Sequence, residues 1–420
     1  MLTMKDKKAI TRELQDKYRK ANKKKKTALL DYFTSLTGYC RSYAARVLRA
    51  YRGKVLGYAV VGGKKVKYVI GKDKKIKRKG KKIYGYDVFL KLKKIWAIYD
   101  FICGKRLAPF MAEAVAKLEK HKEIDLTSEV RKKLSKISAS TIDRMLKKVK
   151  DRYRIGKGRK GTKPGTLLKK AIPIRTFADW DEARPGFVEV DLVGHDGGNT
   201  SGDYMQSLNF IDIATSWDTT VACKNKAQVH VFSAIETASA RFPFKILGID
   251  SDNGSEFINA HLLAYCIQNK ITFTRSRPHK KNDSCFVEQK NYSVVRRNVG
   301  YLRYDTAKEL ILLNELYIHL DYYTNYFQPV MQLTKKIRTG SKTVKKYDIA
   351  KTPFKRVLES DDIKKERKRK LEEIYDKINP AQIKRKITKL QDKLIKLNVL
   401  KKTLERNSTI DEKPKEYIYR

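Results

Sequence analysis

Apolar residues recur at helical spacing along the first 150 residues of the chain. After a basic, helix-prone arm over residues 1–26, TALLDYFTSLTGYCRSYAARVLRAY contains two short apolar stripes on either side of Thr37 and Gly38, which predicts two helices around a turn. EVRKKLSKISASTIDRMLKKVKDRY repeats this arrangement. Ser140, with Asp143 three residues later, predicts a capping box at the start of its second helix. The expected buried positions are Leu29, Leu30, Phe33, Leu36, Tyr43, Ala44, Val47, Leu48, Ile142, Met145, Leu146 and Val149.

Each pair of helices is typical of a helix-turn-helix, although plain packing units show the same pattern. In a helix-turn-helix, the second helix meets DNA phosphates and base edges. The polar residues on that helix are therefore candidate DNA contacts. They are Arg41, Arg46 and Arg49 in the first unit, and Thr141, Arg144, Lys147 and Lys148 in the second.

Two segments rich in glycine and lysine separate these regions. Residues 53–86 contain β-branched pieces such as KVKYVIG, which fit either a loop or small hairpin that follows DNA or a flexible linker. RIGKGRKGTKPGTLLKK, residues 154–170, has no apolar period. It predicts a linker between the helical N-terminal half of the chain and the C-terminal half.

The pattern changes near residue 187 to alternation of apolar and polar positions. FVEVDLV alternates, YMQSLNFIDIATSW and TTVACK predict a hairpin, QVHVFSAIETASARF predicts a helix, and FKILGID predicts a further strand. These elements predict an α/β sheet of mixed direction. Near the C-terminus, IKRKITKLQDKLIKL has one apolar stripe, which fits a short coiled coil or packing against the chain's own body. The stripe comprises Ile383, Ile387, Leu390, Leu394 and Leu397.

Charge adds a partner to this picture. The 420 residues include 95 Lys and Arg against 46 Asp and Glu, a formal net charge of +49, and such an excess indicates a polyanionic partner, first of all nucleic acid. An anionic membrane surface would also attract it. No segment approaches the roughly 18 apolar residues of a spanning helix, and the N-terminus lacks the apolar core of a signal peptide. We therefore expect a protein that stays in the bacterial cytoplasm, associated with the nucleoid.

The five cysteines form no C-x-x-C pair, so we expect small buried thiols and no structural zinc.

Residues 187–260 form an acidic island, with ten acidic and four basic residues. Asp191 stands near the end of one predicted strand, and Asp250 and Asp252 share a face at the end of another. Adjacent strand ends would bring Asp191 and Asp252 together, a costly arrangement of like charges unless a cation lies between them. Oxygen ligands without cysteine or a close histidine pair favour Mg²⁺ or Mn²⁺. Glu288, on a predicted helix with 35 residues between it and Asp252, is the candidate third carboxylate.

These motifs carry a family resemblance. Asp191, Asp252 within DSDNGSEF, and Glu288 within VEQKN resemble the DDE core of the retroviral integrase superfamily, most closely the integrase-type transposases of bacterial insertion sequences. The Asn-Gly that follows Asp252 selects it over Asp250 by this resemblance. DIATSW, FTRSRPHKKND and the stretch from NYFQP to FKRVL look like the same group, so the similarity spans about residues 25–360.

The resemblance implies an RNase H-like fold, a site with two Mg²⁺ or Mn²⁺ ions held by Asp191, Asp252 and Glu288, and transposon-end cleavage followed by attack of the freed 3′-hydroxyl on target DNA. It also implies double-stranded DNA as partner and a homo-oligomer on that DNA. A non-catalytic DNA-binding repressor or domesticated transposase, and a nuclease that cuts without joining, are the alternatives. Basic residues around Glu288 could hold DNA phosphates. They are Lys280, Lys281, Lys290, Arg296 and Arg297.

The predicted fold class is thus a multidomain α plus α/β protein, with N-terminal helix-turn-helix units, a central RNase H-like mixed sheet flanked by helices, and a basic C-terminal region ending in a helix. The expected boundaries are 1–52 for the arm and first helix-turn-helix, 53–86 for the basic loop or hairpin linker, 87–153 for the second helix-turn-helix domain, 154–184 for the linker, 185–325 for the catalytic core, 326–360 for a basic module and 361–420 for the C-terminal helical segment.

Overall fold

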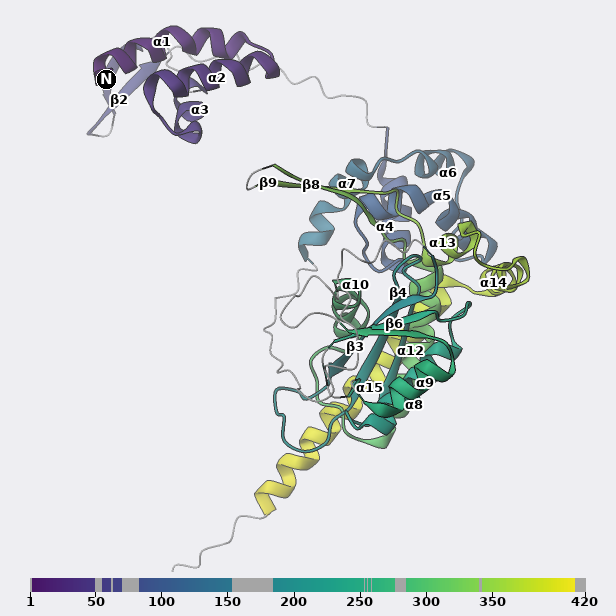
Figure 1. Ribbon diagram of the computed structural model, residues 1–420. Coiled ribbons are helices and arrows are strands. Elements are labelled where there is room, and N and C mark those ends of the chain that lie inside the picture. Colours follow the sequence, from purple (N-terminus) through teal and green to yellow (C-terminus); the bar gives the residue numbers. More distant parts are fainter. Residues whose placement is uncertain are drawn as a thin grey trace, which may run out of the picture. The chain divides into compact units, whose positions relative to one another are not determined.

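The computed structural model describes residues 2–49, 55–61, 63–69, 83–152, 184–252, 254, 256–257, 259–275, 285–339 and 342–411. The chain divides into two compact units, Met1–Lys81 and Lys82–Arg420 (Figure 1). Most of the predicted linker 154–184 lies outside the described residues. None of the helices within the described ranges has the length and apolar content that a bilayer crossing requires.

The first unit contains three helices and a hairpin. The helices are α1 (Met4–Lys20), α2 (Lys23–Thr37) and α3 (Arg41–Arg49), and the strands are β1 (Val55–Val61) and β2 (Lys64–Val69). Gly38 ends α2 with a φ of 66°, as the predicted turn requires. The basic arm is helix α1, and its Leu14 and Tyr18 share a core with Leu30, Phe33, Ala44 and Leu48. Leu36 and Tyr43, expected in that core, are exposed, because α2 and α3 bury only the faces that meet α1 and each other.

The second unit begins with a cluster of four helices. They are α4 (Tyr86–Ile98), α5 (Gly104–Lys120), α6 (Ser128–Ser135) and α7 (Ala139–Arg152). The predicted capping box of Ser140 and Asp143 is wrong. Instead the Ser138 hydroxyl accepts from the backbone N–H of Thr141 at 3.3 Å, while Asp143 accepts from the N–H of Gly104 at 2.9 Å and so caps the start of α5. Ile142 and Leu146 are fully buried as expected.

A five-stranded sheet lies at the centre of this unit, in the order β5-β4-β3-β6-β7 (Figure 1). The strands are β3 (Phe187–Gly194), β4 (Gln206–Asp212), β5 (Asp218–Cys223), β6 (Gly248–Ser251) and β7 (Thr272–Arg275). The first three are antiparallel, whereas β6 is parallel to β3 and β7 is parallel to β6. This mixed sheet with flanking helices fits an RNase H-like core. The predicted hairpin and the strand of FKILGID are confirmed; β7 was not predicted.

Alternation along β3 gives the sheet two different faces. Val188 and Val190 are buried toward one side, where Phe210, the register partner of Val190, stacks edge-on against Phe242 after α8. Glu189 and Asp191 point to the other side. Figure 1 shows α8 and α9 on one side of the sheet and α10 on the other. The bounds of these helices are Gln228–Ala240 for α8, Ala260–Gln268 for α9 and Cys285–Lys290 for α10.

Helix α12 (Ala307–Phe327) covers the edge strand β5. Three of its polar side chains, those of Asn314, Asp321 and Asn325, bind outward-facing backbone groups of that strand. The Asn314 amide group pairs with both the N–H and the C=O of Ala222, and the carboxylate of Asp321 accepts from the N–H of Thr220. These contacts satisfy backbone groups that an edge strand otherwise exposes.

The C-terminal region consists of a hairpin and three helices. They are β8 (Leu333–Thr339), β9 (Lys342–Tyr347), α13 (Pro353–Glu359), α14 (Lys365–Lys377) and α15 (Pro380–Asp411). Ile387, Leu390 and Leu394 are buried where α15 packs on α12, so this part of the predicted stripe packs on the chain's own body. Among the described cysteines, Cys40 and Cys103 are exposed, contrary to expectation.

Candidate active site

Two acidic side chains on β3 accept hydrogen bonds from the helical segment that contains Glu288. The buried Glu189 accepts hydrogen bonds at 2.9 Å from the backbone N–H groups of Phe286 and Val287, in the first turn of α10. Free N–H groups at a helix start favour a carboxylate. Glu189 therefore fixes the start of the helix on which Glu288 lies.

Asp191 holds the same helical segment one turn further along. α10 continues without interruption into a π-helical stretch (Asn291–Arg296) and α11 (Arg297–Val299). The Asn291 side-chain amide donates to Asp191 at 2.6 Å and accepts from Asn209, the register partner of Asp191, at 3.0 Å. Glu288 precedes Asn291 by three residues and is exposed, so the helix presents its carboxylate next to the Asp191 side of the sheet.

Asp252 follows the end of β6, the parallel neighbour of β3. Its carboxylate accepts from the N–H of Gly254 at 2.9 Å. A Cβ at residue 254 would lie 2.6 Å from the carboxylate of Glu256 and 2.9 Å from that of Asp252, so a larger residue at this position would displace one of these two side chains. Glu256 lies outside the helix that follows, because Asn259 caps α9 by accepting from the N–H of Leu262.

Electrostatics link the three predicted ligands. Burial, together with the charges of Asp252 and Glu288, raises the pKa of Asp191 to about 7, although hydrogen bonds from Leu192 and Asn291 act in the opposite direction. Burial also raises the pKa of Asp252. Both effects disfavour the ionised carboxylates, and a cation would relieve this cost.

An all-oxygen donor set of this kind suits Mg²⁺ or Mn²⁺. Within the described ranges, no group of three or more His, Cys, Asp or Glu side chains is gathered closely enough to hold a metal ion. The donor chemistry and the mutual repulsion of Asp191, Asp252 and Glu288 therefore fit a divalent cation, while their ligand geometry stays a prediction.

Asp250 lies behind the site in the sheet. It is buried, it stands in register with Glu189 on β3 and Thr274 on β7, and it accepts from the Thr274 hydroxyl at 2.6 Å. Burial raises the pKa of Glu189 to about 8 and the charge of Asp250 adds to that shift. Asp250 thus belongs to the buried support of the site.

The three described basic residues near Glu288 all contact other groups of the protein. Lys290 is buried, 3.9 Å from the carboxylate of Asp218, and so does not face solvent as a phosphate contact would. Arg296 donates to the carbonyl of Gly194 at 2.7 Å, and Arg297 pairs with Asp100 at 2.9 Å. Lys280 and Lys281 lie outside the described residues.

The predicted DNA contacts on the helices differ in exposure. Arg41, Arg46, Arg49, Arg144, Lys147 and Lys148 are exposed. Thr141 is buried, and its hydroxyl accepts from Ser138, so it is a poor candidate for a base contact. DNA binding by the exposed residues stays a prediction.

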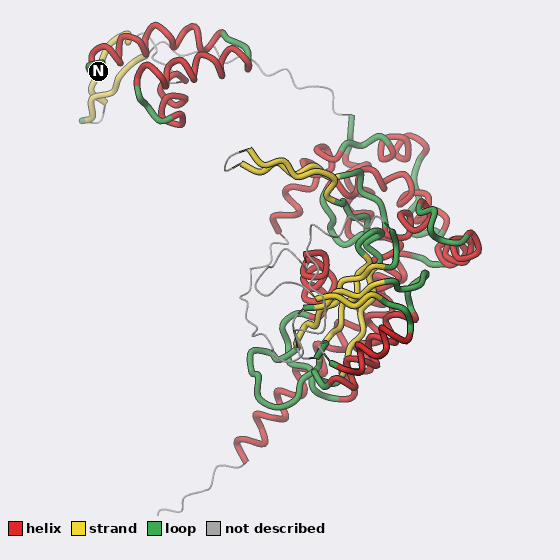
Figure 2. Tube along the Cα trace, in the orientation of Figure 1, coloured by secondary structure: helices red, strands yellow, loops and turns green. Residues whose placement is uncertain are grey.

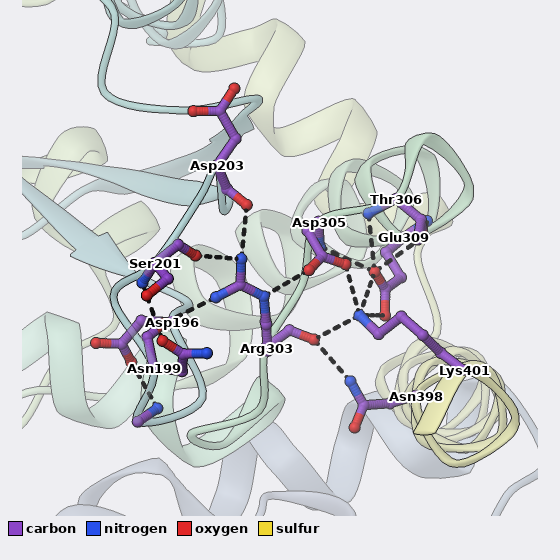
Figure 3. Close-up of polar contacts among 11 residues, drawn as sticks. Asp196, Asn199, Ser201, Asp203, Arg303, Asp305, Thr306, Glu309, Asn398 and Lys401 are labelled. Carbon is purple, nitrogen blue, oxygen red and sulfur yellow. Dashed lines mark hydrogen bonds and ion pairs between the residues drawn. The ribbon is translucent and has the colours of Figure 1, made fainter. Parts of the chain in front are cut away.

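Arg303 organises the loop that follows β3 and was not singled out from the sequence. Its guanidinium donates to three loop carbonyls, at 2.8 to 3.0 Å, and pairs with Asp305 at 2.6 Å (Figure 3). The acceptors are Asn199, Ser201 and Asp203. Arg303 thus holds a loop beside the Asp191 strand although it lies 100 residues from Asp203 in the sequence. A local sequence pattern cannot predict a contact between residues so far apart.

Helix α15 supports this arrangement from the other side. Asn398 and Lys401 donate to the backbone carbonyl of Arg303, at 2.6 and 3.1 Å. Lys401 also pairs with Asp305 at 2.7 Å and with the buried Glu309 at 3.2 Å. Figure 3 shows Arg303 between the loop and α15.

Comparison with known proteins gives one family match and several relatives. The sequence model of the integrase core domain matches residues 181–281. The chain is 36% identical over 344 residues to the uncharacterized protein y4rM of Sinorhizobium fredii. The aligned region covers 81% of this chain and 92% of y4rM. Among solved structures, it is similar to the HTLV-2 integrase catalytic core domain in complex with magnesium, with 15% identity and a TM-score of 0.27. The match covers 35% of this chain and 90% of the HTLV-2 chain. It is also similar to the catalytic core domain of BIV integrase, with 14% identity and a TM-score of 0.27. This match covers 41% of this chain and 94% of the BIV chain.

Proposed function

We propose that this chain, which belongs to the family of the Sinorhizobium fredii protein y4rM and carries an integrase-type core, is a DNA transposase that cleaves transposon ends and joins them to target DNA. Integrase core domains belong to enzymes that transfer polynucleotide strands. In this proposal, Asp191, Asp252 and Glu288 carry out strand transfer with Mg²⁺ or Mn²⁺.

The observation that carries the proposal is the seating of the Glu288 helix on β3. Glu189 and Asp191, on one face of the strand, bind the helix at Phe286, Val287 and Asn291. Two anchor points one turn apart fix the rotation of the helix. Such preorganisation is what in-line transfer of a phosphodiester requires from a protein.

Each side chain has a distinct part in this proposal. Asp191, Asp252 and Glu288 would hold the divalent ions, which when bound activate the attacking hydroxyl and stabilise the leaving oxygen. Asn291 keeps the Asp191 carboxylate in place, and Glu189 positions the helix. Asp191 is half-buried, which limits the water around its carboxylate, so its charge acts in a medium of lower dielectric constant than bulk water.

The test is a joining assay with purified protein. A labelled duplex made from the DNA that flanks the gene serves as the transposon end, and plasmid DNA serves as the target, with Mn²⁺ or Mg²⁺ present. Asp252→Asn and Glu288→Gln should abolish joining, while Glu236→Gln, an exposed acid on α8, should leave it intact. Joining by the Asp252 or Glu288 variants at the wild-type rate would refute the assignment.

The same assay separates the alternatives. Cleavage of end duplexes without joined product under every metal tested would indicate a nuclease. Binding of end duplexes without cleavage or joining would indicate a repressor.

A further inference from the structure

The β8–β9 hairpin carries lysines directly opposite one another. Lys335 is in register with Lys346, and Lys336 with Lys345, although like charges across two strands destabilise a hairpin. All four are exposed, and none makes an ion pair or side-chain hydrogen bond with any residue that the structure describes. Residues 333–347 include six basic residues and no acidic one. The repulsion would be relieved by an anionic partner.

The lysine pairs lie on both faces of the hairpin. Successive residues of a strand point to opposite sides, so the Lys335–Lys346 pair faces one way and the Lys336–Lys345 pair the other. A flat anionic surface, such as a membrane, would need cations on one face only. A ribbon in a groove turns one face to the floor and its two edges to the walls, and the long lysine side chains of either face can reach the phosphates along those walls.

Apolar side chains lie between these charges. Ile337 is in register with Val344, on the same face as Lys335 and Lys346, and both are partly exposed, at 38% and 46%. Apolar side chains of this kind can contact thymine methyl groups on the floor of the major groove. The hairpin therefore combines phosphate-binding and base-contacting chemistry.

The base of the hairpin is fixed to the catalytic sheet. The Gln332 side chain donates to the carbonyls of Ile213 and Ala214, at 3.1 and 2.8 Å, in the turn between β4 and β5. Asp348 accepts from the N–H of Gln332 at 2.7 Å and pairs with Arg356 of α13 at 2.7 Å. Among the strands that the structure describes, β8 and β9 pair only with each other, and Figure 1 shows them extending away from the five-stranded sheet. These contacts fix the base of the hairpin, which Figure 2 draws as a separate two-stranded ribbon.

We propose that the β8–β9 hairpin inserts into the major groove of duplex DNA and sets the position of that duplex relative to the catalytic sheet. The major groove, about 12 Å wide, admits a two-stranded ribbon, whereas the minor groove, about 6 Å wide, does not admit one without deformation. The proposal rests on the proposed function for its partner, DNA, and adds the element, the groove and the residues.

The experiment measures binding of the full-length protein to a duplex as a function of salt. Replacing Lys335, Lys336, Lys345 and Lys346 with Gln should lower the slope of log affinity against log salt by about 3 to 4, because each lost phosphate contact removes about 0.9. The matched control replaces Lys389, Lys393, Lys396 and Lys402 with Gln. These four are exposed on α15 and make no ion pair within the described residues, so their loss should change the slope much less.

Methylation by dimethyl sulfate identifies the groove. The wild-type protein should protect guanine N7, which lies in the major groove, and the hairpin variant should lose that protection while both melt at the same temperature. An unchanged salt slope and unchanged protection would overturn the proposal, even if the protein joins DNA. If binding to anionic vesicles were lost and duplex binding retained, the hairpin would be a membrane contact and the proposal wrong. Protection that depends on the hairpin in a protein that never joins DNA would leave the hairpin proposal standing and refute the transposase assignment.

Discussion

The side-chain amide of Asn325 makes both backbone hydrogen bonds of Asp218. It accepts from the Asp218 N–H at 2.9 Å and donates to the Asp218 carbonyl at 2.7 Å. Asn314 does the same for Ala222 from the other end of α12. Helix side chains thus take the place of a sixth strand along β5, and the sheet has no free edge on this side.

Replacing Asn325 should therefore destabilise the core strongly. Asn325→Leu leaves a buried N–H and a buried C=O without partners, at a cost of about 2 to 4 kcal/mol in the free energy of unfolding. Urea denaturation of the wild type and variant measures this difference. Ile311→Ala, at a position of α12 that is 68% exposed, should cost no more than about 0.5 kcal/mol. Equal losses for the two variants would contradict the role given to Asn325.

Glu189 should act on catalysis through the position of Glu288. In Glu189→Gln the side-chain oxygen can still accept from Phe286 and Val287, whereas in Glu189→Leu it cannot. We expect the Leu variant to join DNA at least about tenfold more slowly, since small displacements of catalytic groups have effects of this size, with unchanged affinity for the end duplex. The Gln variant should stay within a few-fold of wild type. A joining rate for Glu189→Leu equal to that of Glu189→Gln would exclude a positioning role.

Divalent cations should stabilise the core through the three predicted ligands. Mg²⁺ or Mn²⁺ should raise the melting temperature of the wild type, because a bound cation offsets repulsion among Asp191, Asp252 and Glu288. Asp252→Asn removes one of the like charges, so without metal it should melt at or above the wild-type temperature, and metal should shift it little. Calorimetry with EDTA measures the melting temperatures without metal, and calorimetry with added Mn²⁺ measures how far the metal raises them. A variant that still responds fully to Mn²⁺ would place the metal elsewhere.

His195 should make the protein less stable in acid. Burial lowers its pKa to about 3, against an ordinary value near 6.5. Below pH 6.5 the unfolded chain binds a proton that the folded chain does not, so the contribution of His195 is complete above that pH and is lost as the pH falls toward 3. Between pH 7 and 4 the loss is about 2 to 3 kcal/mol. The ring bonds Ser207 at 2.7 Å, a contact that His195→Gln can imitate, so the difference between wild type and variant across pH isolates this effect.

Local patterns predicted the elements of the sheet well. Alternation in FVEVDLV placed Glu189 and Asp191 on one face of β3, and the structure uses both on that face. The stripe through Ile387, Leu390 and Leu394 predicted a buried helix face, although only the structure showed that α12 is its partner. Such patterns depend on the next few residues, which a sequence displays directly.

Contacts between distant residues could not be predicted in this way. A basic residue near an acid suggested that Lys290 binds phosphate, but the buried Asp218, on a strand about 70 residues away, draws it into the core. The support that Glu189 gives the Glu288 helix also joins residues that no spacing connects. The short strand β7 has only four residues, too few for its alternation to stand out.

The contacts of Arg303 with the loop after β3 and with α15 affect the order in which this region can form during translation. Its outer half, Asn398 and Lys401, is synthesised about 200 residues after β3, at the end of a long stretch of translation. The loop beside the Asp191 strand therefore leaves the ribosome without its full support and receives it only when α15 has emerged and docked. A nascent chain would therefore contain Asp191 and its strand well before α15 can complete the surroundings of that strand.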